Sequence, residues 1–279
     1  MNPYFLSYLI LCLAVCMSQE GCAPVDSSHP QDRQQDSIPI SVSGTSQEAH
    51  EAFHSPKYQQ VLLVTTEDWD TPKGILKKYE WDRIEQKWRM KGATLPVLIG
   101  KKGLGWGLGL HNAQGWAGPR KEEGDLKSPA GVFELGTAFG YQVGKPAFEW
   151  PYTPVVLTTM CIEDTQSEYY NEILDEGAVN SDWKSTDHML RKDDLYEWGV
   201  FVLHNSGTPI PGGGSCIFIH VWREGGKGTA GCTSLDKNEL KALLQWMDPE
   251  AQTLLIQVPK THLAKVLDQF DDLRSLKEL

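Results

Sequence analysis

The residues of this sequence best suited to chemistry are His220 and, twelve positions later, Cys232. The histidine ends an apolar, strand-like stretch, 215–221, and the cysteine follows a glycine-rich loop. A cysteine becomes a good nucleophile when a base takes its proton, and a histidine held on a strand can do so. The pattern predicts Cys232 as nucleophile and His220 as its base. Spacing alone leaves open a core histidine and a buried cysteine.

Small residues surround the cysteine. Thr229-Ala230-Gly231 precede Cys232, and Thr233 follows it. Gly231 would let the backbone turn tightly and let a substrate carbonyl approach. The amides of Cys232 and Thr233 could then form an oxyanion hole. A helix expected over 236–247, opened by a capping box, would lower the thiol pKa if its N-terminus is aimed at Cys232.

Short strands separated by glycine and proline turns dominate the rest of the sequence. A glycine-rich run over 100–109 lacks the pattern of a phosphate-binding loop, so turns between strands are the better interpretation. A strand pair is expected over 76–91 with its turn at Trp81-Asp82, and a second helix over 261–276. The other expected strands are 60–66, 95–99, 128–133, 154–159, 200–204, 215–221 and 253–258. The sequence therefore predicts a mostly β fold, a sandwich or barrel-like sheet pair with a few peripheral helices.

The composition sets limits on partners and location. With 40% hydrophobic residues and a net charge of −11, the chain suits a globular domain and disfavours nucleic acid or an anionic membrane as partner. An apolar run over 4–17 is short for a membrane span and predicts an export signal at 1–18, with Cys16 as a possible lipidation point. Polar residues over 19–56 predict a disordered tether, and 57–279 a single domain, with no membrane span in the mature chain.

Three cysteines fall in the predicted domain, which leaves an odd one if two of them pair. The candidate pair is Cys161–Cys216, and two buried free cysteines are the alternative. A metal site of His204, Cys216, His220 and Cys232 is disfavoured, because two residues four apart on one strand lie roughly 13 Å apart. Neither a metal nor a cofactor is predicted.

Several ordered blocks of the sequence resemble the L,D-transpeptidase catalytic domain family over about residues 58–260. They are His220 with Thr229-Ala230-Gly231-Cys232, the stretch GDLKSPAGVF at 124–133, Phe139-Gly140-Tyr141, and segments 167–171 and 214–220. The resemblance implies a β-rich fold and acyl transfer in the bacterial cell envelope. Cys232 would attack an L-to-D bond of a peptidoglycan stem peptide, and an amine of a neighbouring stem would resolve the thioester. His220 would serve as base and acid, steadied by a backbone carbonyl, and Gly231 would shape the oxyanion loop.

The sequence departs from the family pattern in the substrate region. The His-to-Cys gap is short, Ala230 stands where many members have His, Asn or Arg, and Ser234 replaces a common arginine that would contact a substrate carboxylate. The residues expected to bind substrate are Thr229, Thr233, His204 and Arg223, with Arg191 as a further candidate for carboxylates. A packed strand histidine remains the alternative for His204.

Two other functions remain open. Water could resolve the same acyl-enzyme, which would make the protein an L,D-carboxypeptidase or endopeptidase. A cell-wall-binding module without catalysis is the other alternative. The expected partners are donor and acceptor stem peptides, and the sequence does not indicate an oligomeric state.

Overall fold

The computed structural model describes residues 56–223 and 225–278. The predicted export signal, the Cys16 lipidation point and nearly all of the predicted tether lie outside the described residues. Within the described part of the chain, no helix has the length and apolar character needed to cross a membrane.

Strands account for most of the regular structure. They are β1 Gln60–Thr66, β2 Lys73–Asp82, β3 Lys87–Leu98, β4 Leu104–Trp106, β5 Ser128–Gly140, β6 Tyr152–Pro154, β7 Thr159–Ile162, β8 Ile173–Asp175, β9 Thr186–His188, β10 Trp198–Val202, β11 Phe218–Val221, β12 Thr233–Leu235 and β13 Thr253–Pro259. The helices are α1 Lys237–Trp246, α2 Lys260–Leu267 and the 3₁₀ helices η1 Pro249–Ala251 and η2 Asp271–Glu278.

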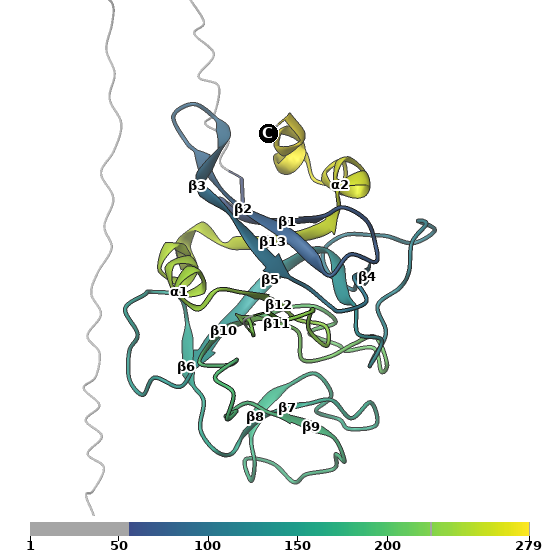
Figure 1. The fold of residues 1–279 in the computed structure, drawn as a ribbon, viewed down its shortest axis with the longest axis vertical. Coiled ribbons are helices and arrows are strands. Elements are labelled where there is room, and N and C mark those ends of the chain that lie inside the picture. The colour runs from purple at the N-terminus through teal and green to yellow at the C-terminus, as the bar shows by residue number, and fades with distance from the viewer. Residues whose placement is uncertain (1–55, 224, 279) are drawn as a thin grey trace, which may run out of the picture. The chain divides into compact units, whose positions relative to one another are not determined.

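Eight strands close into a barrel-like sheet (Figure 1). Their order is β5-β13-β1-β2-β3-β12-β11-β10, and β10 pairs with β5 to complete the circuit. Closure leaves the eight-stranded circuit without an open edge. The mostly β, barrel-like fold expected from the sequence is confirmed.

β1 and β13 form a parallel pair within this sheet. Their sequences, QVLLVTT and TLLIQVP, are buried almost throughout, as expected for strands covered on both faces. Leu, Val and Ile side chains of these strands join the main hydrophobic core. This core therefore stabilises the barrel, in which β11 and β12 are two of the strands.

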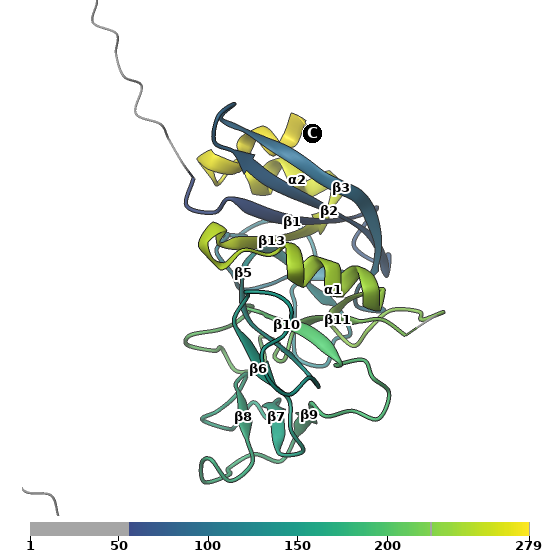
Figure 2. The same ribbon diagram turned by 90° about the vertical axis from the view of Figure 1, so that its left-hand side faces the viewer.

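The helices cover the barrel from outside (Figure 2). α1 contacts β10 and β11 and buries Leu240, Leu243 and Leu244, while Asp236 caps its N-terminus. The second predicted helix, 261–276, is instead α2 followed by η2. Leu273 and Leu276 are both buried three residues apart, a spacing that suits the three-residue turn of a 3₁₀ helix.

The hairpin between β2 and β3 turns later than predicted. Trp81 stays in the ladder opposite Trp88, with ring centroids 5.6 Å apart, and the turn occupies 83–86. Asp82 Oδ1 accepts hydrogen bonds from two turn amides. The aromatic pair therefore extends the hairpin beyond the expected turn, and the stretch 95–99 mainly continues β3 rather than forming a separate strand.

A separate three-stranded sheet, β8-β7-β9, lies at the end of the described molecule opposite α2 (Figures 1 and 2). The expected strand over 154–159 is wrong. β6 ends at Pro154, and the amide of Val156 bonds to Thr159 Oγ1 in a turn that leads into β7. This small sheet belongs to the long connection between β6 and β10, and it contributes to the site described next.

Candidate active site

Two neighbouring parallel strands bring His220 and Cys232 together. β11 carries His220, which pairs with Ser234 of β12, and Cys232 directly precedes β12. Because side chains alternate along a strand, Cys232, two residues before Ser234, projects from the same face. Both residues line one pocket of about 320 Å³. The structure thus places the predicted base and nucleophile in one site.

The Cys232 thiol is buried between two backbone groups. The Phe218 N–H donates to Sγ at 3.3 Å, and the thiol donates to the Cys216 carbonyl oxygen at 3.5 Å. Burial raises the pKa of Cys232 to about 12, against the opposing effect of the Phe218 N–H. Helix α1 begins only at Lys237, after β12. The lowered thiol pKa that was expected if the helix N-terminus is aimed at Cys232 does not occur, because burial outweighs the other effects on the charged form.

His220 is oriented by the backbone. Its Nδ1 lies 2.7 Å from the Val221 carbonyl oxygen, which assigns the proton to Nδ1 and leaves Nε2 free to accept one. The Tyr196 ring packs edge-on against the imidazole, with centroids 5.2 Å apart. Burial lowers the pKa of His220 to about 4, although the carbonyls of Val221 and Leu195 oppose this. The residue is accordingly a neutral imidazole at neutral pH.

We expect the resting pair to behave as a thiol and a neutral imidazole rather than as an ion pair. With pKa values of about 12 for Cys232 and about 4 for His220, neither group titrates at neutral pH. Alkylation of Cys232 by iodoacetamide should therefore rise about tenfold per pH unit between about pH 6 and 9, following the thiolate fraction. Mass spectrometry would locate the label, and a rate plateau near neutral pH would contradict the expectation.

The turn before the nucleophile is held by Thr229. Its Oγ1 donates to the Cys232 carbonyl oxygen at 2.6 Å and accepts from the Gly231 N–H at 3.1 Å. Gly231 does not have a positive φ. A Cβ there would instead meet Ile217 Cδ1 at 3.2 Å and the Lys127 carbonyl oxygen at 3.3 Å. Close packing, rather than a left-handed turn, is what favours glycine at this position.

Basic side chains gather in the pocket of this acidic protein. Lys101, Arg191, Arg223 and Lys227 all line it. Asp193 pairs with both arginines, at 2.9 Å and 2.8 Å. Neither lysine has a carboxylate within ion-pair distance among the residues that the structure describes. Among the described residues, the two lysines thus give the pocket positive charge that no carboxylate pairs with, which suits a ligand carboxylate.

Sequence reasoning missed the residues that support the histidine from the long β6–β10 connection. Tyr196 is buried beside His220, and its hydroxyl donates to Asp187 Oδ2. The guanidinium of Arg191 lies 5.1 Å from the centre of the Tyr196 ring. No motif marks Tyr196 or Asp187, because only the packing of the small sheet onto the barrel brings them to the site.

Two of the predicted substrate-binding residues lie elsewhere. Thr233 is buried, its Oγ1 donates to Gln257 Oε1, and it does not line the pocket. His204 is also buried outside the pocket lining. Its Nδ1 accepts from the Leu108 N–H, and its Nε2 lies 3.0 Å from the Gly213 carbonyl oxygen. Both ring nitrogens of His204 are thus engaged with the backbone. Thr229 and Arg223, in contrast, do line the pocket.

The candidate disulfide Cys161–Cys216 is present, and Cys232 is the free cysteine of the described residues. The bond joins β7 of the small sheet to the segment that precedes β11. Because its sulfur is in the disulfide, Cys216 cannot be a thiolate ligand of a metal ion together with His204, His220 and Cys232. Within 56–223 and 225–278, no group of three acidic, cysteine or histidine residues is arranged to hold a metal ion.

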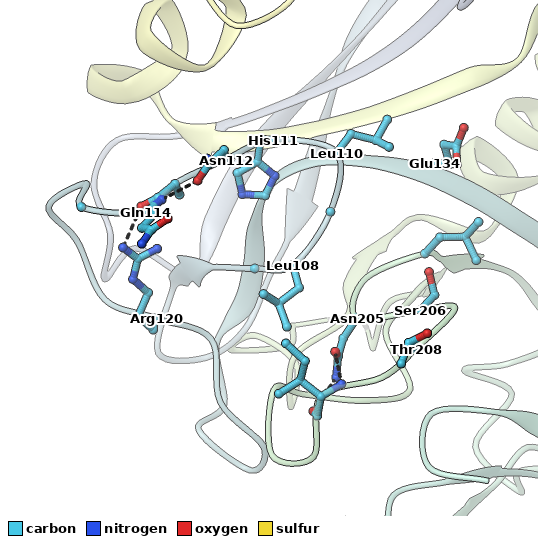
Figure 3. A pocket seen from close by; sticks show the side chains of 16 residues that line it. Leu108, Leu110, His111, Asn112, Gln114, Arg120, Glu134, Asn205, Ser206 and Thr208 are labelled. Carbon is cyan, nitrogen blue, oxygen red and sulfur yellow. Dashed lines mark hydrogen bonds between the residues drawn. The ribbon is translucent and has the colours of Figure 1, made fainter. Parts of the chain in front are cut away.

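A larger cavity lies apart from this pair of residues (Figure 3). It has a volume of about 600 Å³ and is formed by loop 107–115, segment 203–210, Arg120 and Glu134. Its lining contains neither His220 nor Cys232. The side chain of Asn205 bonds to the backbone of Ile210 at one wall. Choosing the site by cavity volume alone would therefore have selected a cavity that does not contain the nucleophile.

Comparison with known proteins identifies the family. The model of the L,D-transpeptidase catalytic domain, YkuD, matches residues 77–258. The crystal structure of the helical cell shape determining protein Pgp2 from Campylobacter jejuni is 17% identical, with a TM-score of 0.35. The match covers 71% of this chain and 47% of that one, so the chain spans about half of that protein's length. Such a likeness does not bear on function. No curated protein matches the chain.

Proposed function

Because the chain belongs to the L,D-transpeptidase catalytic domain family, we propose that it is a peptidoglycan L,D-transpeptidase that cross-links stem peptides through a thioester on Cys232. The observation that carries the proposal is a free thiol beside a neutral imidazole in one basic pocket. A stem peptide offers both an acyl carbon for the thiol and carboxylates for the basic side chains.

The first half-reaction makes the acyl-enzyme. Cys232 Sγ bonds to the carbonyl carbon of the L-centre, and its proton passes to His220 Nε2. The C–N bond to the terminal D-residue then breaks, and the imidazolium returns the proton to the leaving amine. Because the pKa of His220 is about 4, the imidazolium is a strong acid and gives this proton up readily.

The second half-reaction reverses these roles. The amine of an acceptor stem attacks the thioester carbon, and His220 takes the amine proton. The C–S bond breaks, and the proton returns to Cys232. The Phe218 N–H, already 3.3 Å from the sulfur, stabilises the departing thiolate. Water in place of the amine would give a carboxypeptidase or endopeptidase through the same steps.

We propose that the two lysines of the pocket hold a substrate carboxylate, in place of the arginine that Ser234 replaces. A double variant Lys101→Ala/Lys227→Ala should raise KM roughly 3- to 10-fold with little change in kcat, as expected for two exposed charges. The effect should shrink as salt rises. Lys145→Ala is the matched control, because this exposed lysine lies outside the pocket and pairs with Glu149. An unchanged KM in the double variant would refute this role.

The test of the whole proposal is a product assay. Purified protein is incubated with tetrapeptide and pentapeptide muropeptides, and the products are followed by mass spectrometry. A cross-linked dimer that lacks one terminal D-alanine is the expected product. A tripeptide without dimer would replace transpeptidation by hydrolysis. Unchanged substrates without a thioester on Cys232 would favour the wall-binding alternative.

We propose that the protein acts in the periplasm or cell envelope, after export directed by residues 1–18. Support comes from the Cys161–Cys216 disulfide, because disulfides persist in oxidising compartments. The apolar run at 4–17 is consistent with this. Fractionation of cells would test the location, and labelling with a fatty-acid analogue in a Cys16→Ser variant would test lipidation at Cys16.

A further inference from the structure

Asn171, which lies between β7 and β8, has a buried side chain whose hydrogen bonds reach into the site. Its Nδ2 donates to the carbonyl oxygens of His204 and Asn205, at 2.9 and 2.8 Å. Its Oδ1 accepts the Cys216 N–H at 2.8 Å. Its own φ is +67°, a conformation that asparagine tolerates better than most residues. The amide thus ties the long β6–β10 connection to both ends of the β10–β11 loop, 203–217.

Cys216, the residue that Asn171 holds, is in contact with the nucleophile. Its carbonyl oxygen accepts the thiol hydrogen bond of Cys232 at 3.5 Å, and two residues later the Phe218 N–H donates to the same sulfur. Cys216 has a φ of +54°, which is unusual for a residue with a side chain. The Asn171 bond fixes its N–H, and the disulfide fixes its side chain. Together these two constraints set the direction of the carbonyl.

We propose that Asn171 is a positioning residue for the nucleophile, acting through Cys216. It holds the Cys216 carbonyl where the thiol proton rests, while the pairing of β11 with β10 holds the Phe218 N–H toward the sulfur. The proposal rests on the proposed function only in taking Cys232 as the nucleophile. The Cys216 carbonyl favours the thiol, and the Phe218 N–H favours the thiolate. Asn171 therefore supports the resting thiol through Cys216, and β11 supports the thiolate through Phe218.

Removal of the Asn171 amide has two separable consequences. Cys216 loses the hydrogen bond that fixes its N–H, so its carbonyl no longer holds the thiol in one orientation and the sulfur is less well aimed at the acyl carbon. The sulfur also loses the carbonyl that favours the thiol and becomes less enclosed, whereas the Phe218 N–H stays in β11. The pKa of Cys232 therefore falls from about 12 towards the range of an ordinary cysteine. Acyl transfer should thus slow while the reactivity of the thiol toward a small alkylating agent increases. A substitution that only weakens the fold would not produce this pair of opposite changes in the folded protein.

The experiment compares Asn171→Ala, Asn171→Asp and the control Asn205→Ala in the full chain. Asn205 is matched because it too is a buried asparagine at positive φ, and its amide bonds to Ile210 and Gly214 rather than to Cys216. The readouts are kcat and KM for muropeptide turnover, the rate of Cys232 alkylation by iodoacetamide at about pH 8, and the melting temperature. All rates are measured well below the melting temperature of each variant.

In Asn171→Ala we expect kcat to fall about 10- to 100-fold, as for a misplaced nucleophile, with KM within about twofold. Alkylation should rise about tenfold or more, since each unit by which the thiol pKa falls raises the thiolate fraction about tenfold. Asn171→Asp keeps the acceptor for the Cys216 N–H and should restore part of kcat. Asn205→Ala should leave the alkylation rate within about twofold of the wild type.

Two results would overturn the proposal. One is an alkylation rate in both Asn171 variants equal to that of the wild type. The other is an equal loss of kcat and an equal rise in alkylation in Asn205→Ala. Alkylation needs no peptidoglycan substrate, so it separates the two proposals. If the wild type transfers no acyl group and Asn171→Ala still alkylates faster, the proposed function fails and the positioning role stands.

Discussion

A His220→Asn variant is expected to lose about 100- to 10,000-fold in kcat with little change in KM. Asparagine can still donate to the Val221 carbonyl oxygen, as Nδ1 does now, so the local fold should be retained. What it lacks is a nitrogen that can accept the thiol proton. Because the pKa of Cys232 is about 12, the thiol cannot supply enough thiolate by itself. The measurement is steady-state turnover of muropeptides, with circular dichroism to confirm folding.

The companion variant is Cys232→Ser, which keeps the shape of the side chain and replaces the sulfur. Its turnover should be lost, because a hydroxyl is a much weaker nucleophile than a thiol under the same base. The double variant with His220→Asn should be no slower than the slower single variant, since two residues that act in one step are not additive. Full activity in Cys232→Ser would show that the thiol is not the nucleophile.

The barrel was largely predictable because its strands carry their own signal. β1 was expected over the residues that form it, and the expected strands at 128–133, 215–221 and 253–258 each overlap a barrel strand. Continuous runs of Val, Ile and Leu bounded by turn residues indicate buried strands regardless of what they pair with. His220 followed from the same signal, because it lies at the end of such a strand. Cys232 was instead indicated by the small residues around it after a glycine-rich loop, and β12 was not expected.

The electrostatic part of the site was predictable only for Arg191 and Arg223, which were expected to bind carboxylates and do line the pocket. Tyr196, Asp187 and Asp193 lie in the long β6–β10 connection, whose position depends on the disulfide and on contacts of Asn171. Lys101 lies in a turn far away in the chain, yet it lines the same pocket as Lys227. No local sequence pattern predicts that Lys101 and Lys227 lie in the same pocket. The thiol pKa was also missed, because the sequence shows the nearby helix but not the depth of burial.

Removal of the disulfide should have the largest effect on stability. The variant Cys161→Ala/Cys216→Ala, which leaves no unpaired partner, is expected to lower the free energy of unfolding by about 4 kcal/mol. The reason is the length of the loop that the bond closes, a sequence separation of 55 residues, since chain entropy in the unfolded state grows with loop length. Urea unfolding followed by tryptophan fluorescence gives the value.

Reduced wild-type protein is the internal control, because it lacks the same cross-link without any substitution. Its midpoint of urea unfolding should match that of the double variant. The midpoint of the wild type without reductant should be higher than both. Equal midpoints for the oxidised wild type and the double variant would contradict the expectation.

The disulfide also has an expected effect on catalysis. The bond anchors Cys216, whose carbonyl contacts the Cys232 thiol, so its loss should slow acyl transfer even where the barrel remains folded. A folded barrel with a slow nucleophile would show that the small sheet serves the site as well as the stability of the fold.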